Sequence, residues 1–189
     1  MIPYVASHVD VPVQRVIDPT LLLTSNEYDK IADERLENEK YLLLYARRYN
    51  PHMEAYAEKL AAENGWKIVE ISLRAKNAEK TNRRMFYEAG VEEFLSLTKY
   101  AECVVTNSLH GTIFAVQYSK PLCVFSREQC DTKIKELLAL FGLTDHMLVS
   151  GAEDKGNLND INYEVVHSRI AEARKKSLEF LRMELTSCF

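Results

Sequence analysis

Two kinds of hydrophobic pattern alternate along most of this chain. Short continuous apolar runs, such as Tyr41–Tyr45 and Leu122–Phe125, are typical of strands that are buried on both faces of a sheet. Longer segments place apolar residues three or four positions apart, as in the stretch that follows Pro51, and this spacing is typical of helices. The alternation predicts repeated β-α units, and hence a three-layer Rossmann-like α/β domain whose mostly parallel sheet has helices on both faces.

Local signals set the expected boundaries. Thr24 and Glu27 have the spacing of a capping box, Asn50 precedes a first-turn proline, and Gly65 and Gly142 follow helical runs. The first part of the chain is expected to form an extended segment at 11–17, a turn at Asp18-Pro19 and a helix at 24–38, followed by strands at 41–45 and 66–72 with a helix between them from Asn50 to Gly65. The middle is expected to form an irregular polar stretch at 74–90, a helix at 91–99, a strand around Cys103 and a helix after His110 that stops before Lys120. The last part is expected to form a strand at 122–125, a helix from Asp131 or Thr132 to Gly142, a loop at 150–159 and a long helix at 162–185.

Composition excludes several classes of protein. The 189 residues suit one well-packed domain, with 47% hydrophobic and 28% charged residues. A net charge of −4 and the lack of a basic stripe argue against a nucleic-acid partner. No apolar run approaches the roughly 20 residues of a membrane helix, and the first residues do not resemble a signal peptide.

The cysteines carry no metal or disulfide signature. None of Cys103, Cys123, Cys130 and Cys188 forms a C-x-x-C pair, and their spacing fits no zinc pattern. Cys103 and Cys123 lie in apolar runs and are expected to be small buried hydrophobes. Reduced thiols and the absence of an export signal favour a cytoplasmic location, and no metal or cofactor is expected.

The strongest candidate for chemistry is the stretch 106–112, Thr-Asn-Ser-Leu-His-Gly-Thr. It joins an apolar strand to an amphipathic helix, so His110 is expected at or near the start of that helix. The first amides of a helix lack partners within it and attract anions. Gly111 lets a ligand approach the backbone, and a histidine tuned near neutral pH can transfer a proton. The competing interpretation is an ordinary turn, since most turn histidines have no chemical role.

Other polar residues are expected at the same edge of the sheet. Arg47-Arg48, Arg74 and Arg127 follow three predicted strands, and ligands of parallel sheets bind outside the carboxyl ends of the strands. A solvated surface role is as good an interpretation for Arg127 and a better one for Arg47-Arg48 and for the basic residues at 74–84. Asp18 is interpreted as a structural turn residue.

Four segments together resemble the polysaccharide pyruvyl transferase family. They are Asp18–Leu23 (DPTLLL), Tyr41–Tyr45 (YLLLY), Glu93–Leu95 (EFL) and above all Ala101–Pro121 (AECVVTNSLHGTIFAVQYSKP). Their order and spacing look right over about residues 13–150, and the strand–TNSLHG–helix–KP block is the specific part.

The resemblance implies transfer of pyruvate from phosphoenolpyruvate to a pair of sugar hydroxyls, which gives a cyclic ketal in surface polysaccharide biosynthesis. It also implies a glycosyltransferase-B-like arrangement of two Rossmann-like domains, of which residues 1–189 look like the C-terminal one alone. The expected partners are therefore an anionic donor, a saccharide acceptor and an N-terminal domain, with the chain being either a fragment or a natural half.

The resemblance gives the candidate residues their roles. His110 is the expected general acid or base, and Asn107, Ser108, Gly111, Thr112 and Arg127 are the expected substrate-binding residues. Many family members carry arginine where this chain has Ser108, although a subgroup with serine exists and is the closest match. Because Ser108 cannot hold an anionic donor by charge, Arg127 or an arginine at 74–84 is expected to take that role.

Two other functions remain open at this point. A nucleotide-sugar glycosyltransferase half would also bind a diphosphate at a helix N-terminus, but it should show a carboxylate placed for a ribose, and none is convincing. A non-catalytic half that binds a glycan or a partner chain is favoured by the missing domain and the missing arginine.

Overall fold

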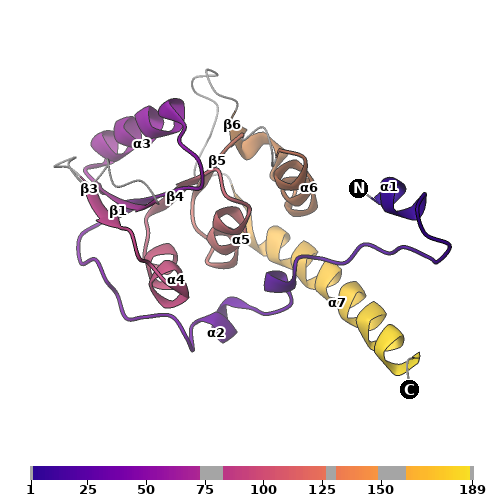
Figure 1. Ribbon diagram of the computed structural model, residues 1–189. Coiled ribbons are helices and arrows are strands. Elements are labelled where there is room, and N and C mark those ends of the chain that lie inside the picture. Colours follow the sequence, from indigo (N-terminus) through magenta and orange to yellow (C-terminus); the bar gives the residue numbers. More distant parts are fainter. Residues whose placement is uncertain (1, 73–82, 127–130, 149–160, 188–189) are drawn as a thin grey trace.

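Six parallel strands form one sheet in the order β3-β2-β1-β4-β5-β6 (Figure 1). The computed structural model describes residues 2–72, 83–126, 131–148 and 161–187. Every strand pair that it contains is parallel, so the predicted α/β class with a mostly parallel sheet is confirmed. The strands are β1 (Tyr41–Ala46), β2 (Lys67–Ser72), β3 (Arg83–Phe86), β4 (Cys103–Thr106), β5 (Leu122–Phe125) and β6 (Met147–Leu148).

Helices cover both faces of the sheet and thereby give the three predicted layers (Figure 1). Alternate residues of β1 point to opposite faces, so Leu42 and Leu44 belong to one core cluster and Tyr41 and Leu43 to the other. The first cluster contains side chains of α3 (Pro51–Asn64). The second contains side chains of α4 (Val91–Lys99), α5 (Leu109–Gln117), α6 (Asp131–Phe141) and α7 (Tyr163–Ser187).

Helix boundaries follow the capping signals in the sequence. The Asn50 side chain accepts hydrogen bonds from the amides of His52 and Met53, and Gly65 ends α3 in the left-handed conformation at φ 65°. Gly142 closes α6 in the same way at φ 75°. Within the part of the chain that the structure describes, no helix has the length and apolar character needed to cross a bilayer.

The N-terminal segment reaches the sheet through short elements. Figure 1 shows α1 (Ile2–Ala6) lying away from the sheet, and residues 12–18 then lead to the 3₁₀ helix η1 (Pro19–Leu21). The Asp18 carboxylate accepts a hydrogen bond from the amide of Thr20 at 3.0 Å. Asp18 is therefore a cap of this turn, as predicted.

The helix predicted at 24–38 is much shorter than expected. The Glu27 carboxylate accepts a hydrogen bond from the Thr24 amide at 2.7 Å, so the predicted capping interaction forms. However, α2 spans only Ser25–Tyr28. The chain beyond it bonds to α4 instead, since the Asp33 amide donates to the carbonyl of Glu92 and the Ser96 hydroxyl donates to the carbonyl of Glu34. Tertiary contacts override the local helical signal here.

The sequence prediction also missed the N-terminal helix α1 and three other short elements. Strand β3 lies at the edge of the sheet within the stretch expected to be irregular, and its polar sequence concealed it. Strand β6 at the other edge and the 3₁₀ helix η3 (Thr144–His146) are too short to give a periodic signal. The loop expected at 150–159 lies outside the described residues.

The two cysteines in the sheet are expected to be chemically inert in the folded protein. Cys103 and Cys123 are buried, and burial raises the pKa of the Cys123 thiol to about 11 and that of Cys103 well above its ordinary value. Because the thiolate is the reactive form, a C130S/C188S variant should react with a disulfide reagent at pH 8 only after unfolding. A time course with and without guanidinium chloride measures this, and rapid labelling of the native variant would contradict the buried positions.

Candidate functional site

The junction between β4 and α5 forms a tight turn at the carboxyl edge of the sheet. Strand β4 ends at Thr106, Ser108 is the N-cap of α5, and the Ser108 hydroxyl accepts a hydrogen bond from the Gly111 amide at 3.3 Å. The Thr112 hydroxyl donates to the carbonyl of Ser108 at 3.0 Å. His110 is thus the second residue of the helix, as the sequence predicts, and its side chain is exposed.

Asn107 holds two segments of this edge together. Its side-chain oxygen accepts a hydrogen bond from the Arg47 amide at 2.9 Å, and its side-chain nitrogen donates to the carbonyl of Arg48 at 2.7 Å. The residue is 1% exposed. The carboxamide therefore fixes the backbone after β1 against the turn that carries His110, and its polar atoms bond to backbone rather than to solvent.

Gly111 permits the close approach of α5 to the sheet. A Cβ atom at this position would lie 2.4 Å from the Thr106 hydroxyl oxygen and 2.9 Å from Cδ1 of Tyr45. The Thr106 hydroxyl is held in place by two hydrogen bonds: it donates to the carbonyl of Tyr45 at 2.7 Å and accepts from the Ser108 amide at 3.0 Å. The sequence prediction assigned Gly111 to ligand approach, and the structure adds this packing role.

Substituting Gly111 with alanine is expected to destabilise the domain by about 1–3 kcal/mol, the usual cost of overpacking. The added methyl group must displace Thr106 and break at least one of its two hydrogen bonds. Urea unfolding followed by circular dichroism measures the loss. Alanine at Gly90, where the nearest atoms belong to the flexible side chains of Glu93 and Glu92, is the control and should cost less. Equal stability of the Gly111→Ala variant and the unmodified chain would contradict this packing.

Two backbone amides at this edge are available to a ligand. The first two amides of α5, those of Leu109 and His110, form no hydrogen bond within the described residues. Arg47 and Arg48 follow β1 at the same edge and are exposed, as predicted. Arg74 and Arg127 lie outside the described residues. The catalytic role of His110 and the binding roles of Asn107, Ser108, Gly111, Thr112 and Arg127 stay predictions.

The basic residues at 74–84 were expected to form a solvated loop, and for Arg83 this expectation is wrong. Arg83 lies in β3 with its side chain fully buried, and its guanidinium donates to Glu70 of β2 at 2.8 Å and to Glu58 of α3 at 2.6 Å. Glu54 of α3 lies 3.6 Å away. Burial opposes the charge of Arg83, yet the hydrogen bonds to Glu70 and Glu58 outweigh it and raise its pKa. Glu54 and Glu58 lie four residues apart in α3, on one side of the helix, and this spacing was the signal in the sequence that could have indicated a partner for a buried arginine.

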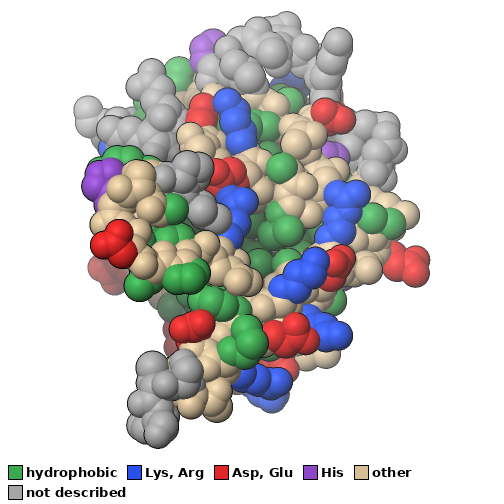
Figure 2. Space-filling model, turned by 90° about the vertical axis from the view of Figure 1, so that its right-hand side faces the viewer, with side chains coloured by type: hydrophobic (Ala, Val, Ile, Leu, Met, Phe, Trp, Pro, Cys, Tyr) green, Lys and Arg blue, Asp and Glu red, His purple; other side chains and the backbone are tan. Residues whose placement is uncertain are grey.

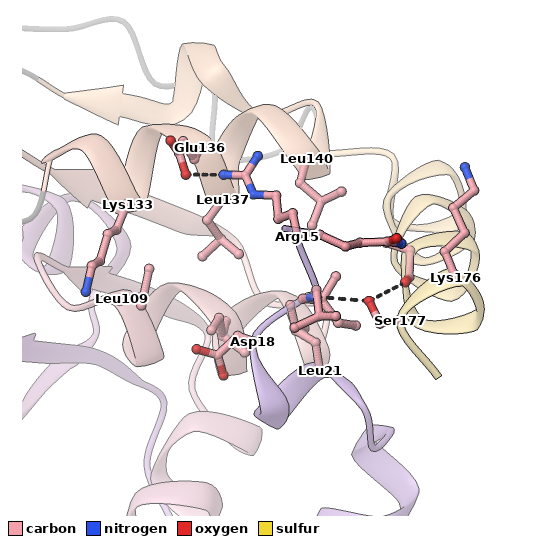
Figure 3. Close-up of a pocket in the computed structure, with 15 residues that line it drawn as sticks. Arg15, Asp18, Leu21, Leu109, Lys133, Glu136, Leu137, Leu140, Lys176 and Ser177 are labelled. Atoms are coloured by element: carbon pink, nitrogen blue, oxygen red, sulfur yellow. Dashed lines mark hydrogen bonds and ion pairs between the residues drawn. The ribbon is translucent and has the colours of Figure 1, made fainter. Parts of the chain in front are cut away.

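A cavity of about 490 Å³ lies beside the first turn of α5, between that helix, α6, α7 and residues 14–18 (Figure 3). Leu109 and Ile113 of α5 line it. His110 is not among the described residues that line it. The cavity itself was not predicted from the sequence.

Comparison with known families now identifies the chain. The sequence model of the polysaccharide pyruvyl transferase family matches residues 6–129, which include the whole β4–α5 junction. The chain belongs to the polysaccharide pyruvyl transferase family. This membership confirms the resemblance drawn from the TNSLHG block. No curated protein sequence matches the chain.

Solved structures show similarity to the domain at low sequence identity. ADP-heptose lipopolysaccharide heptosyltransferase II of E. coli is 17% identical, with a TM-score of 0.40 over 90% of this chain and 57% of its own. The UDP-GlcNAc 2-epimerase of Methanocaldococcus jannaschii is 14% identical, with a TM-score of 0.45 over 82% and 42%. The glycosyltransferase SnogD of Streptomyces nogalater is 12% identical, with a TM-score of 0.47 over 93% and 49%. This chain thus spans about half the length of these proteins. Because the TM-scores are all below 0.5, these similarities carry no information about the site.

Proposed function

We propose that this pyruvyl transferase family member carries the donor-binding and proton-transferring half of a pyruvyl transferase site, with His110 at its centre. The observation that supports this most is the position of His110: it is exposed, in the first turn of α5, at the carboxyl edge of the sheet and inside the family match. Ligands of parallel sheets bind at that edge.

The proposed reaction moves pyruvate from phosphoenolpyruvate to two hydroxyl groups of a sugar. The C3 methylene gains a proton and becomes a methyl group, which makes C2 electrophilic. One hydroxyl oxygen attacks C2, the bond from C2 to the phosphate oxygen breaks, and the second hydroxyl then closes the ketal. Two hydroxyl protons are released in all; they balance the proton added at C3 and the one carried away by hydrogen phosphate.

Each candidate residue has a distinct task in this scheme. His110 transfers the proton to C3 or removes one from a hydroxyl. The open amides at the start of α5 bind the donor phosphate or carboxylate, since a helix N-terminus favours negative charge by about 0.3–1 kcal/mol. Arg127 binds the remaining anionic group in a bidentate manner. Asn107, Ser108 and Thr112 hold the turn, and Gly111 brings it close to the sheet.

This half is expected to bind the donor but not to turn it over alone. A single Rossmann-like domain supplies one wall of a site, whereas ketal formation needs the sugar hydroxyls held against C2 with water excluded. Phosphate release from phosphoenolpyruvate in the presence of a galactoside or mannoside acceptor should therefore stay at background for the 189 residues and appear when a second domain is supplied. Robust turnover by these residues alone would contradict the half-site.

An NMR titration tests donor binding directly. Phosphoenolpyruvate should shift the amide signals of Leu109, His110 and Gly111 first, with inorganic phosphate giving a weaker version of the same pattern. A CMP- or UDP-sugar is the competing ligand, because it would bind at the same helix if the chain were a glycosyltransferase half. Saturable shifts with the nucleotide sugar and none with phosphoenolpyruvate would overturn the proposed donor.

A further inference from the structure

The cavity beside α5 has the dimensions of a ligand site rather than of a packing defect. Its volume of about 490 Å³ lies within the range of roughly 300–1,000 Å³ that small-molecule sites occupy. Protein interiors otherwise contain few voids larger than a water molecule. On the face shown in Figure 2, hydrophobic side chains lie in a hollow and Lys and Arg side chains lie on either side of it.

The interior of the cavity is aliphatic. Branched side chains from three elements converge on it, and no aromatic ring is among the described residues that line it, so this part of its wall offers no stacking surface for a sugar. Figure 3 shows several of these side chains pointing toward one another across the space. The labelled ones are Leu21 of η1, Leu109 of α5, and Leu137 and Leu140 of α6, and Ile113 of α5 also lines the cavity.

The polar groups of the wall mostly satisfy one another. Arg15 forms an ion pair with Glu136, and Asp18 caps η1 through Thr20. The Ser177 hydroxyl accepts from the Ile17 amide at 3.0 Å and donates to the carbonyl of Ala173 at 2.9 Å. These contacts also fix residues 15–18 across the cavity. A ligand would therefore meet aliphatic surface inside and few unsatisfied dipoles.

One cation in the wall has no ion-pair partner among the described residues. Lys176 is paired with Glu172 at 2.6 Å, and in Figure 3 its ammonium group points away from the cavity. Lys133 of α6 forms no hydrogen bond or ion pair with any residue that the structure describes, and Figure 3 places it on the side of Leu109. An aliphatic interior whose wall carries one cation that is unpaired among the described residues fits a chain that ends in an anionic group.

We propose that this cavity binds a single-chain aliphatic anion, with its hydrocarbon tail among Leu109, Leu137 and Leu140 and its anionic head at the ammonium of Lys133. This proposal does not rest on the donor site proposed at His110, although the two adjoin at Leu109, whose amide belongs to the donor site and whose side chain lines the cavity. Leu109 belongs to the α5 turn and lines the cavity, so a bound tail lies directly against the element that carries His110.

Titration with octanoate, followed by amide NMR, tests the site. Octanoate should give saturable shifts at Leu109, Ile113, Leu137 and Leu140, whereas acetate, which has the charge without the tail, should give none there. 1-Octanol should bind about three- to fivefold more weakly, the value of one exposed charge pair. Equal shifts with acetate, or the absence of saturable octanoate shifts, would overturn the proposal.

Two variants that fill the cavity with a larger side chain, and one that removes the charge of Lys133, test the position of the ligand. Leu140→Trp and Leu109→Trp, both at half-buried positions, should each weaken octanoate binding about tenfold, equivalent to the burial of roughly two methylene groups. Val165→Trp, on the exposed face of α7, is the matched control and should bind as the unmodified chain does. Lys133→Gln should weaken octanoate but not 1-octanol. Unchanged octanoate binding in folded Leu140→Trp and Leu109→Trp variants would place the ligand elsewhere.

Discussion

Replacing Arg83 with methionine is expected to lower the free energy of unfolding by about 3–5 kcal/mol, the typical cost of removing one partner from a buried ion pair. The Arg83 side chain is fully buried and ties the edge strand β3 to Glu70 of β2 and Glu58 of α3. Glu70 is 1% exposed, so without the guanidinium its charge loses a hydrogen-bonded partner at a site that water does not reach. Urea unfolding of the variant and the unmodified chain measures the difference.

The neighbouring arginine provides the matched control. Arg84 lies in the same strand with a half-exposed side chain, and it pairs with Glu37 at 3.2 Å. Arg84→Met should cost less than Arg83→Met, because Arg84 is half-exposed and its buried partner Glu37 also accepts a hydrogen bond from the Glu39 amide at 3.1 Å. The double variant Arg83→Met/Glu70→Met should recover much of the lost stability, since it removes both charges together. Similar costs for the two single arginine variants would contradict the buried network.

The sequence predicts the central part of this fold well because its local signals and its tertiary environment agree. Strand β4, the turn with His110 and helix α5 follow directly from a continuous apolar run, small polar residues and an amphipathic run. Helix α4 also has the predicted bounds, and its apolar residues lie on the buried side. In such segments the local sequence preferences and the packing of the folded domain favour the same structure.

Other features depend on contacts that no local pattern encodes. The helix predicted at 24–38 ends after Tyr28 because the chain that follows bonds to α4. Strand β3 escaped prediction because its buried arginine is satisfied by carboxylates from 13 to 25 residues away along the chain. The carboxamide of Asn107 is committed to the backbone of Arg47 and Arg48, a pairing visible only once β1 and β4 lie side by side.

Replacing His110 with alanine should reduce pyruvyl transfer by roughly 10²-fold or more in a protein that contains this chain and a second domain, because a positioned acid or base contributes that much. His110 is exposed, so the loss should come without a change in unfolding temperature. His110→Gln keeps a hydrogen-bonding side chain but cannot transfer a proton at neutral pH, and it should be as impaired as the alanine variant. Steady-state phosphate release from phosphoenolpyruvate measures both.

His8 offers a control for this experiment. It is an exposed histidine near the N-terminus, outside the elements that build the proposed site, so His8→Ala should leave turnover unchanged. Loss of activity in both histidine variants would indicate a general effect of the substitutions. Full activity of a folded His110→Ala variant would remove His110 from the mechanism and leave the helix amides without their proposed catalytic partner.

The most direct test of the central claim follows the transferred carbon. A protein that contains this chain and a second domain is incubated with phosphoenolpyruvate labelled at C2 and a galactoside or mannoside acceptor, and the label is followed by NMR. The account predicts that the labelled carbon becomes a ketal carbon bonded to two sugar oxygens, with one phosphate released per ketal, and that His110→Ala abolishes the signal. Label that remains in phosphoenolpyruvate or appears only as free pyruvate, while a nucleotide sugar donates its sugar to the same acceptor, would contradict it.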